Sequence, residues 1–118
     1  MSDESLERKE LGKIKSVEFG LGGYQDACLG IQFSLGGESW GVGDWKGPWD
    51  FNLIECDSHS RWTEEDREKQ AIEMLKFISN LLRDANVRHI SQLKNKPIEV
   101  TFKNYNTLKG WRILKEVL

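Results

Sequence analysis

The residues best suited to chemistry lie together in the segment 40–50, which reads WGVGDWKGPWD. Three of the five tryptophans and three of the eleven glycines fall within it. Tryptophan supplies a large flat ring, and glycine leaves the backbone next to it uncovered. Aromatic faces beside a cation hold a nucleobase by stacking and a phosphate by charge. We therefore expect this segment to bind a partner rather than to break a bond.

The predicted binding residues fall into three groups by chemistry. Aromatic side chains would stack on a flat ring, basic side chains would contact phosphate, and one carboxylate would accept a hydrogen bond. These groups predict a non-enzymatic protein that captures a small nucleotide-like ligand. Because the same residue types form hot spots between proteins, an interaction module that inhibits or adapts a host protein stays open as the alternative. The predicted set is Tyr24, Trp45 and Trp49 for stacking, Lys46, Arg61 and Arg112 for phosphate, and Asp44 for a ribose or base hydrogen bond.

An enzymatic site has weaker support. A catalytic nucleophile needs a nearby base and a third group that orients the base. The remaining combination, Asp44 or Asp50 with His59, requires these side chains to meet in one pocket. Cys56, Asp57 and His59 lie in a polar loop, which we interpret as solvated surface rather than a metal site. We expect no catalytic activity, no cofactor and no metal.

Length and charge narrow the class of protein. The chain has 118 residues, and we expect a single domain over residues 1–118 with a disordered tail over residues 1–10. A net charge of −2 argues against binding to duplex DNA, which relies on clustered Lys and Arg. No apolar run is long enough for a membrane span, and the polar start does not match a signal peptide. We therefore expect no membrane partner and a cytoplasmic protein with two free thiols.

Alternation of apolar and polar residues predicts the strands. One strand is expected over 13–19 and a second over 29–35. A third begins after the Gly36-Gly37 hairpin signal and ends at Gly47-Pro48. Trp40 and Asp44 share one face of that third strand, and we expect Trp40 to belong to the core. A short strand over 51–54, a strand over 97–103 and a last strand over 108–117 complete the set, with a turn at 104–106.

A long amphipathic helix is expected from Thr63 to Ala85. Thr63 with Asp66 resembles a capping box, and the acidic residues that follow Thr63 favour the positive end of the helix dipole. Apolar residues at helical spacing form a broad stripe that must cover a sheet. The fold class that follows is α+β, an antiparallel β-sheet of about five strands with one long helix packed on it. The stripe comprises Ala71, Ile72, Met74, Leu75, Phe77, Ile78, Leu81 and Leu82.

The chain also resembles a family of small proteins from tailed phages and prophages. The resemblance covers residues 14–49 through the runs VEFG, GGYQDA and WGVGDWKG, and extends weakly to WTEEDR at 62–67 and LKGWRIL at 108–114. Small phage proteins include counter-defence factors, among them oligomeric sponges that sequester cyclic nucleotide signals, such as the Thoeris anti-defence family. By analogy alone, the resemblance implies a counter-defence role in the host cytoplasm. We also expect a homo-oligomer, because small domains with surplus aromatic residues often bury them between copies.

Overall fold

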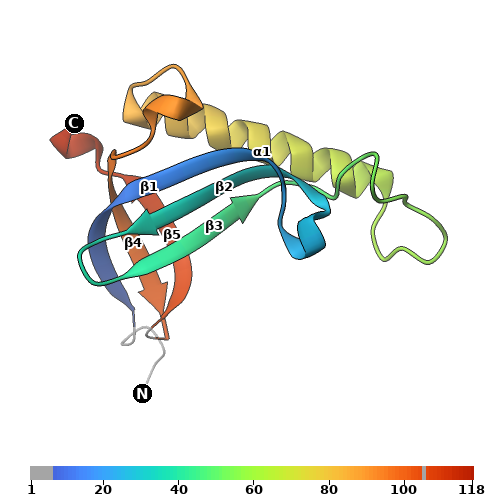
Figure 1. Ribbon diagram of the computed structural model, residues 1–118, viewed down its shortest axis with the longest axis horizontal. Coiled ribbons are helices and arrows are strands. Elements are labelled where there is room, and N and C mark those ends of the chain that lie inside the picture. The colour runs from blue at the N-terminus through green and yellow to red at the C-terminus, as the bar shows by residue number, and fades with distance from the viewer. Residues whose placement is uncertain (1–6, 105) are drawn as a thin grey trace.

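Alternating apolar residues of the central strands form one face of a five-stranded antiparallel sheet, and the amphipathic helix packs on that face (Figure 1). The computed structural model describes residues 7–104 and 106–118. The predicted α+β fold is confirmed. The elements are β1 (Arg8–Gly22), β2 (Cys28–Gly36), β3 (Gly41–Lys46), α1 (Glu64–Ala85), β4 (Pro97–Lys103) and β5 (Thr107–Ile113), with 3₁₀ turns η2 (Tyr24–Asp26), η3 (Ile90–Gln92) and η4 (Lys115–Val117).

The sheet has the strand order β3-β2-β1-β4-β5. The long central strand β1 connects the β2–β3 part of the sheet to the β4–β5 part. The first half of β1 pairs with β4, with Arg8 opposite Phe102, and its second half pairs with β2, with Leu21 opposite Leu29. A register shift at Lys15 marks the change of partner. Figure 1 shows β4 and β5 running steeply across the direction of β2 and β3. The sheet is therefore strongly curved.

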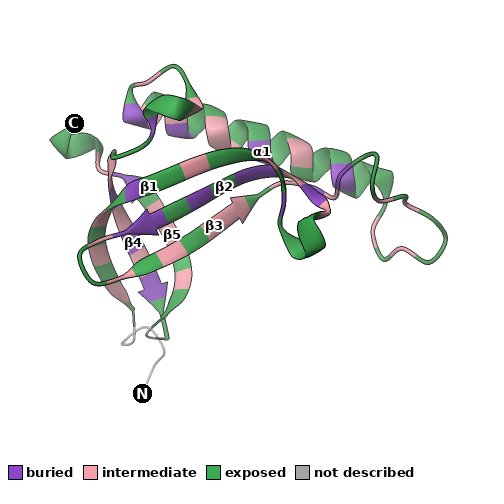
Figure 2. Cartoon of the chain, in the orientation of Figure 1, coloured by how far each residue is buried: buried purple, intermediate pink, exposed green. Residues whose placement is uncertain are grey.

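The core lies between the concave face of the sheet and α1. Phe33 on β2 and Val100 on β4 are fully buried, and Met74, Leu81 and Ala85 are the buried apolar residues of the helix. Figure 2 shows that most of β2 is buried, with exposed positions at Gln32 and Ser34, whereas only separated turns of α1 are buried. Ile72 and Leu75 are exposed, so the buried stripe of the helix is narrower than the sequence predicts.

The helix begins and ends as its sequence predicts. The Thr63 side chain accepts a hydrogen bond from the Asp66 N–H, and the Asp66 carboxylate accepts one from the Thr63 N–H, so the capping box is present. At the other end Asn86 takes the left-handed conformation with φ 56°, which allows its N–H to return to the last turn. No helix in the described part of the chain is long and apolar enough to cross a membrane.

Three predicted boundaries need correction. The expected tail over residues 1–10 is wrong at Arg8–Glu10, which belong to β1 because they pair with β4; residues 1–6 lie outside the described part. Residues 51–54 form a turn rather than a strand, since the Asp50 carboxylate accepts the N–H groups of Asn52 and Leu53. The last strand ends at Ile113, and of the expected turn at 104–106 the middle residue lies outside the described part.

Candidate functional site

Three of the predicted binding residues border one turn. The rings of Tyr24 and Trp49 meet edge to face, with centroids 6.3 Å apart. Trp45 lies over the glycines before η2, where a Cβ on Gly22 would approach the Trp45 ring to 2.9 Å. Trp49 bridges to Cys28, the first residue of β2 after the turn. The structure therefore brings the predicted aromatic residues together, with Tyr24 exposed and both tryptophans half-buried.

The predicted cations do not join these rings. Lys46 is opposite Ile31 on the face of the sheet that carries the core, with its Nζ 5.1 Å from the Phe77 ring centroid. Arg112 on β5 is bound by the carboxylates of Glu99 and Glu116. The predicted combination of stacking rings with nearby cations is therefore not formed at turn η2. Arg61 is exposed in the loop before the helix and forms no ion pair with a described residue.

The ion pairs of Arg112 shift the titration of both partners. The hydrogen bond from Arg112 is the main reason why the pKa of Glu116 lies below its ordinary value. The same contact, with a smaller contribution from Glu99, raises the pKa of Arg112. Both side chains are exposed, and their ion pair links β5 to η4.

Asp44 accepts two hydrogen bonds from groups within the protein. Its Oδ1 accepts the N–H of Trp45 at 3.0 Å, and its Oδ2 accepts the indole N–H of Trp111 at 2.7 Å. Each oxygen already has one protein donor, so the predicted hydrogen bond to a ribose or base would use a remaining acceptor position of the carboxylate. The second bond joins β3 to β5, the two edge strands of the sheet.

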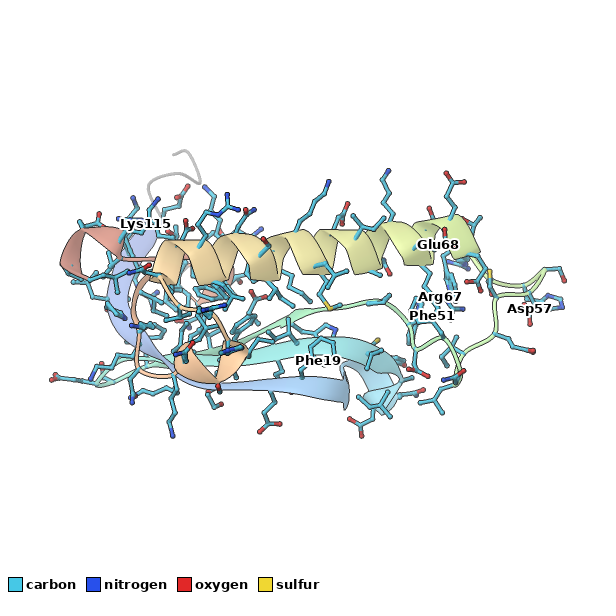
Figure 3. All side chains as sticks on the ribbon, turned by 90° about the horizontal axis from the view of Figure 1, so that it is seen from above. Phe19, Phe51, Asp57, Arg67, Glu68 and Lys115 are labelled. Atoms are coloured by element: carbon cyan, nitrogen blue, oxygen red, sulfur yellow. The ribbon has the colours of Figure 1, made fainter. Side chains whose placement is uncertain are left out.

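Arg67 is a buried residue that sequence analysis missed. It is 1% exposed, and its guanidinium donates to the carbonyl oxygens of Asp50 at 3.0 Å and Ile54 at 2.8 Å. It also lies over the rings of Trp62 and Phe51, 4.5 and 5.1 Å from their centroids. Figure 3 shows Arg67 at the start of α1 beside Phe51. One feature of the sequence could have predicted its burial: position 67 continues the buried stripe of the helix toward the N-terminus.

A cavity of about 590 Å³ lies where β1 bends away from the tip of the β2–β3 hairpin. Lys13 and Lys15 line it, and neither forms an ion pair with a described residue. Trp40 is half-buried there, and its ring contacts Phe102 edge to face at 5.6 Å. We call this cavity the hairpin notch; its lining is Glu10, Leu11, Gly12, Lys13, Lys15, Gly36, Gly37, Glu38, Ser39 and Trp40.

At one wall of the hairpin notch, the Trp40 ring and neighbouring backbone leave no space for a side chain at Gly12 or Gly37. A Cβ added at Gly37 would overlap the Trp40 indole nitrogen and come within 3.0 Å of the Leu11 carbonyl oxygen. A Cβ at Gly12 would lie 2.6 Å from the Trp40 ring. The expectation that Trp40 belongs to the core is confirmed by its packing, although part of it also lines the hairpin notch. Lys13 and Lys15 were not predicted, because their position depends on the strand register and the bulge.

Comparisons with known proteins return no similar molecule: no family model matches the chain, and no curated protein or solved structure matches it either. Among the described residues, no three of His, Cys, Asp or Glu gather in a way that suits a metal ion. A function for this chain is therefore inferred from the geometry of the sites themselves.

Proposed function

We propose that this protein is a non-enzymatic binding protein that captures a small nucleotide-like ligand in the hairpin notch. The observation that carries the proposal is a cavity of about 590 Å³ whose lining includes the Trp40 indole and two lysines that form no ion pair with a described residue. Typical small-molecule sites have volumes of roughly 300–1,000 Å³. The predicted chemistry of ring and cation is thus retained, but Trp40, Lys13 and Lys15 replace the residues first expected to supply it.

The chemistry of the lining matches the parts of a nucleotide. The ammonium groups of Lys13 and Lys15 suit phosphate oxygens, and the accessible part of Trp40 suits the base. Glu38 and Ser39, at the tip of the hairpin, offer a carboxylate and a hydroxyl to ribose or base hydrogens. The contact of Trp40 with Phe102 fixes its ring before a ligand arrives, which lowers the entropy lost on binding.

Capture is proposed in preference to catalysis because of what lines the cavity. Its described lining has no histidine or cysteine, and we assign Ser39, Glu38 and the two lysines to ligand binding. By analogy alone with small phage proteins, we propose a counter-defence role in the host cytoplasm, with a nucleotide signal as the captured ligand. A sponge requires only tight binding, so a rigid notch on a stable sheet is sufficient for that role.

Isothermal titration with cyclic dinucleotides, cyclic ADP-ribose derivatives and AMP tests the proposal. We expect at least one of them to bind, and neutralisation of each notch lysine to glutamine to weaken binding by roughly tenfold. Lys69→Gln and Lys76→Gln remove equal charge from exposed helix positions outside the hairpin notch and serve as matched controls. The proposal is wrong if no ligand binds, or if Lys13→Gln and Lys15→Gln bind as well as the controls do.

A second candidate function, a protein-interaction module, is favoured by a different part of the molecule. Tyr24, Phe51 and Leu53 are 70%, 49% and 57% exposed, and Trp49 contacts Tyr24. Arg67 holds the loop that carries two of them, which makes the surface rigid. Rigid exposed aromatic residues are typical of interface hot spots. If this function holds, Tyr24→Ala removes a stoichiometric host partner in affinity capture, whereas Lys13→Gln retains it.

We also propose that copies of this protein associate with one another. The second half of β1 pairs with β2 on one side, and no described strand pairs with its other side. Its apolar residues Phe19 and Leu21, and Leu75 on the helix, are exposed. Unprotected strand edges with apolar side chains favour contact between copies. We expect light scattering to show an oligomer and Phe19→Lys to reduce its mass, with Lys9→Glu as the control; a monomeric wild-type protein would contradict this expectation.

A further inference from the structure

The two edge strands of the sheet meet beneath the helix, and a second cleft lies at their junction. The Trp111 indole on β5 donates to Asp44 on β3, so the curved sheet closes at this point. Two cavities of about 280 and 210 Å³ flank the junction, and both are lined by Lys46 and Phe77. We call them together the Lys46 cleft. The hairpin notch shares no lining residue with it.

Apolar side chains supply much of the wall of the Lys46 cleft. Met74 and Phe77 come from α1, and Leu108 and Trp111 come from β5. The rings of Phe77 and Trp111 contact each other edge to face with centroids 5.9 Å apart, so their positions are fixed. A small aromatic or aliphatic body would exchange water contacts for contacts with these side chains.

One cation of the Lys46 cleft has no carboxylate partner among the described residues, although its ammonium lies 5.1 Å from the centroid of the Phe77 ring. Lys46 is exposed and forms no ion pair with a described residue, whereas Lys109 is bound to Glu7 at 2.8 Å. Asp44 has donors on both oxygens. Glu73 lines the larger cavity and adds one negative charge on the helix side. Gln70 and the backbone at Gly47 and Gly110 complete the polar lining.

We infer that the Lys46 cleft binds a small amphipathic monoanion, a carboxylate or sulfonate on an aromatic or short aliphatic body. The anionic group contacts the Lys46 ammonium at the mouth, and the body lies against Phe77 and Trp111. The carboxylates of Glu73 and Asp44 repel additional negative charge, so a polyphosphate is disfavoured in this cleft. This ligand class differs from the nucleotide of the hairpin notch, and the inference does not depend on that proposal.

The indole N–H of Trp111 gives a direct readout, because it lies at the base of the Lys46 cleft. Titration with naphthalene-1-carboxylate is followed by ¹H–¹⁵N NMR, with the indole signals assigned by tryptophan substitution. We expect saturable shifts of the Trp111 indole signal and no shift of the Trp40 signal. The neutral analogue naphthalene-1-methanol should bind roughly tenfold more weakly, since it lacks the ionic contact with Lys46.

Two variants distinguish the ionic contact with Lys46 from the volume of the Lys46 cleft. Lys46→Met keeps a long apolar stem and should weaken naphthoate roughly tenfold, whereas the exposed helix variant Lys76→Met should bind normally. Leu108→Trp, which fills the smaller cavity, should abolish the saturable shift. The inference is overturned if wild-type protein shows no saturable Trp111 shift, or if Lys46→Met binds naphthoate as tightly as Lys76→Met does. Nucleotide titrations of Lys46→Met report independently on the hairpin notch.

Discussion

Replacement of the buried Arg67 by methionine removes the contacts that hold the loop before the helix. Two hydrogen bonds disappear, from the guanidinium to the carbonyl oxygens of Asp50 and Ile54 at 3.0 and 2.8 Å. A hydrogen bond that involves a charged group contributes about 1.5–3 kcal/mol. The ion pair with Glu64 adds little, because Glu64 is largely exposed and surface pairs contribute about 0–1 kcal/mol.

One feature of the wild-type site reduces this loss. The Arg67 Nε is buried without a hydrogen-bond partner in the described part of the chain, and an unmet donor costs about 1–3 kcal/mol. Methionine removes that cost and still fills space between the rings of Phe51 and Trp62. At the midpoints of these ranges, the two lost hydrogen bonds less the relieved donor leave an expected decrease of about 2–3 kcal/mol in the free energy of unfolding.

Urea unfolding followed by tryptophan fluorescence measures the global loss in Arg67→Met. Trypsin reports on the loop itself, because Arg61 is an exposed cleavage site within it. We expect faster cleavage after Arg61 in the variant. Glu64→Gln is the matched control, with a change within about 0.5 kcal/mol. A loss below about 1 kcal/mol together with unchanged cleavage after Arg61 would refute the assigned role of the guanidinium.

Three further results are expected from contacts elsewhere in the sheet. A double-mutant cycle of Asp44→Ala and Trp111→Phe should give a coupling energy of about 1–2 kcal/mol in urea unfolding, because the partly buried indole N–H donates to a carboxylate. Gly30→Ala should lower the free energy of unfolding by more than about 1 kcal/mol, since its Cβ would overlap a β3 carbonyl oxygen. In Arg112→Ala the pKa of Glu116, followed by NMR, should rise. In the wild-type protein the pair stabilises the fold at pH values above the ordinary carboxyl pKa. This contribution is lost as the pH falls through the lowered pKa of Glu116.

The glycine result has a control within the same sheet, and each of the other two has an outcome that would contradict it. Gly20 has open space around an added Cβ, so Gly20→Ala should be close to neutral and separates a steric effect from loss of backbone freedom. A coupling energy near zero would show that the bond between the edge strands contributes nothing measurable. An unchanged carboxyl titration in Arg112→Ala would contradict the assigned cause of the low pKa.

Most secondary structure was predictable because its signals are local. The alternation on β2 and β4 and the capping box at Thr63 each involve residues only a few positions apart. The strand predicted over 51–54 was wrong for a non-local reason. Asp50 accepts backbone N–H groups there, and Arg67 from the helix binds the carbonyl oxygens of the same loop. Apolar content alone does not reveal that competition for backbone hydrogen bonds.

The candidate sites were less predictable than the elements that carry them. Strand alternation correctly separated Trp45 from Asp44, but it did not show that Asp44 meets Trp111 from the far edge strand. The hairpin notch depends on the bulge at Lys15 and on where β1 changes partner, neither of which is encoded in a short pattern. The strand register therefore decides which residues share a cavity, and the residue types of one segment do not reveal it.

The double pairing of β1 also has a consequence for folding during synthesis. The second half of β1 can pair with β2 once the first 36 residues have been made. The first half of β1 can pair only after β4, which ends at residue 103, has been made. At about 5–20 residues per second, synthesis of residues 37–103 takes roughly 3–13 s. During that interval the β1–β3 meander can form, but residues 8–12 have no partner strand on either side. The nascent chain thus exposes an unpaired strand until its last quarter leaves the ribosome.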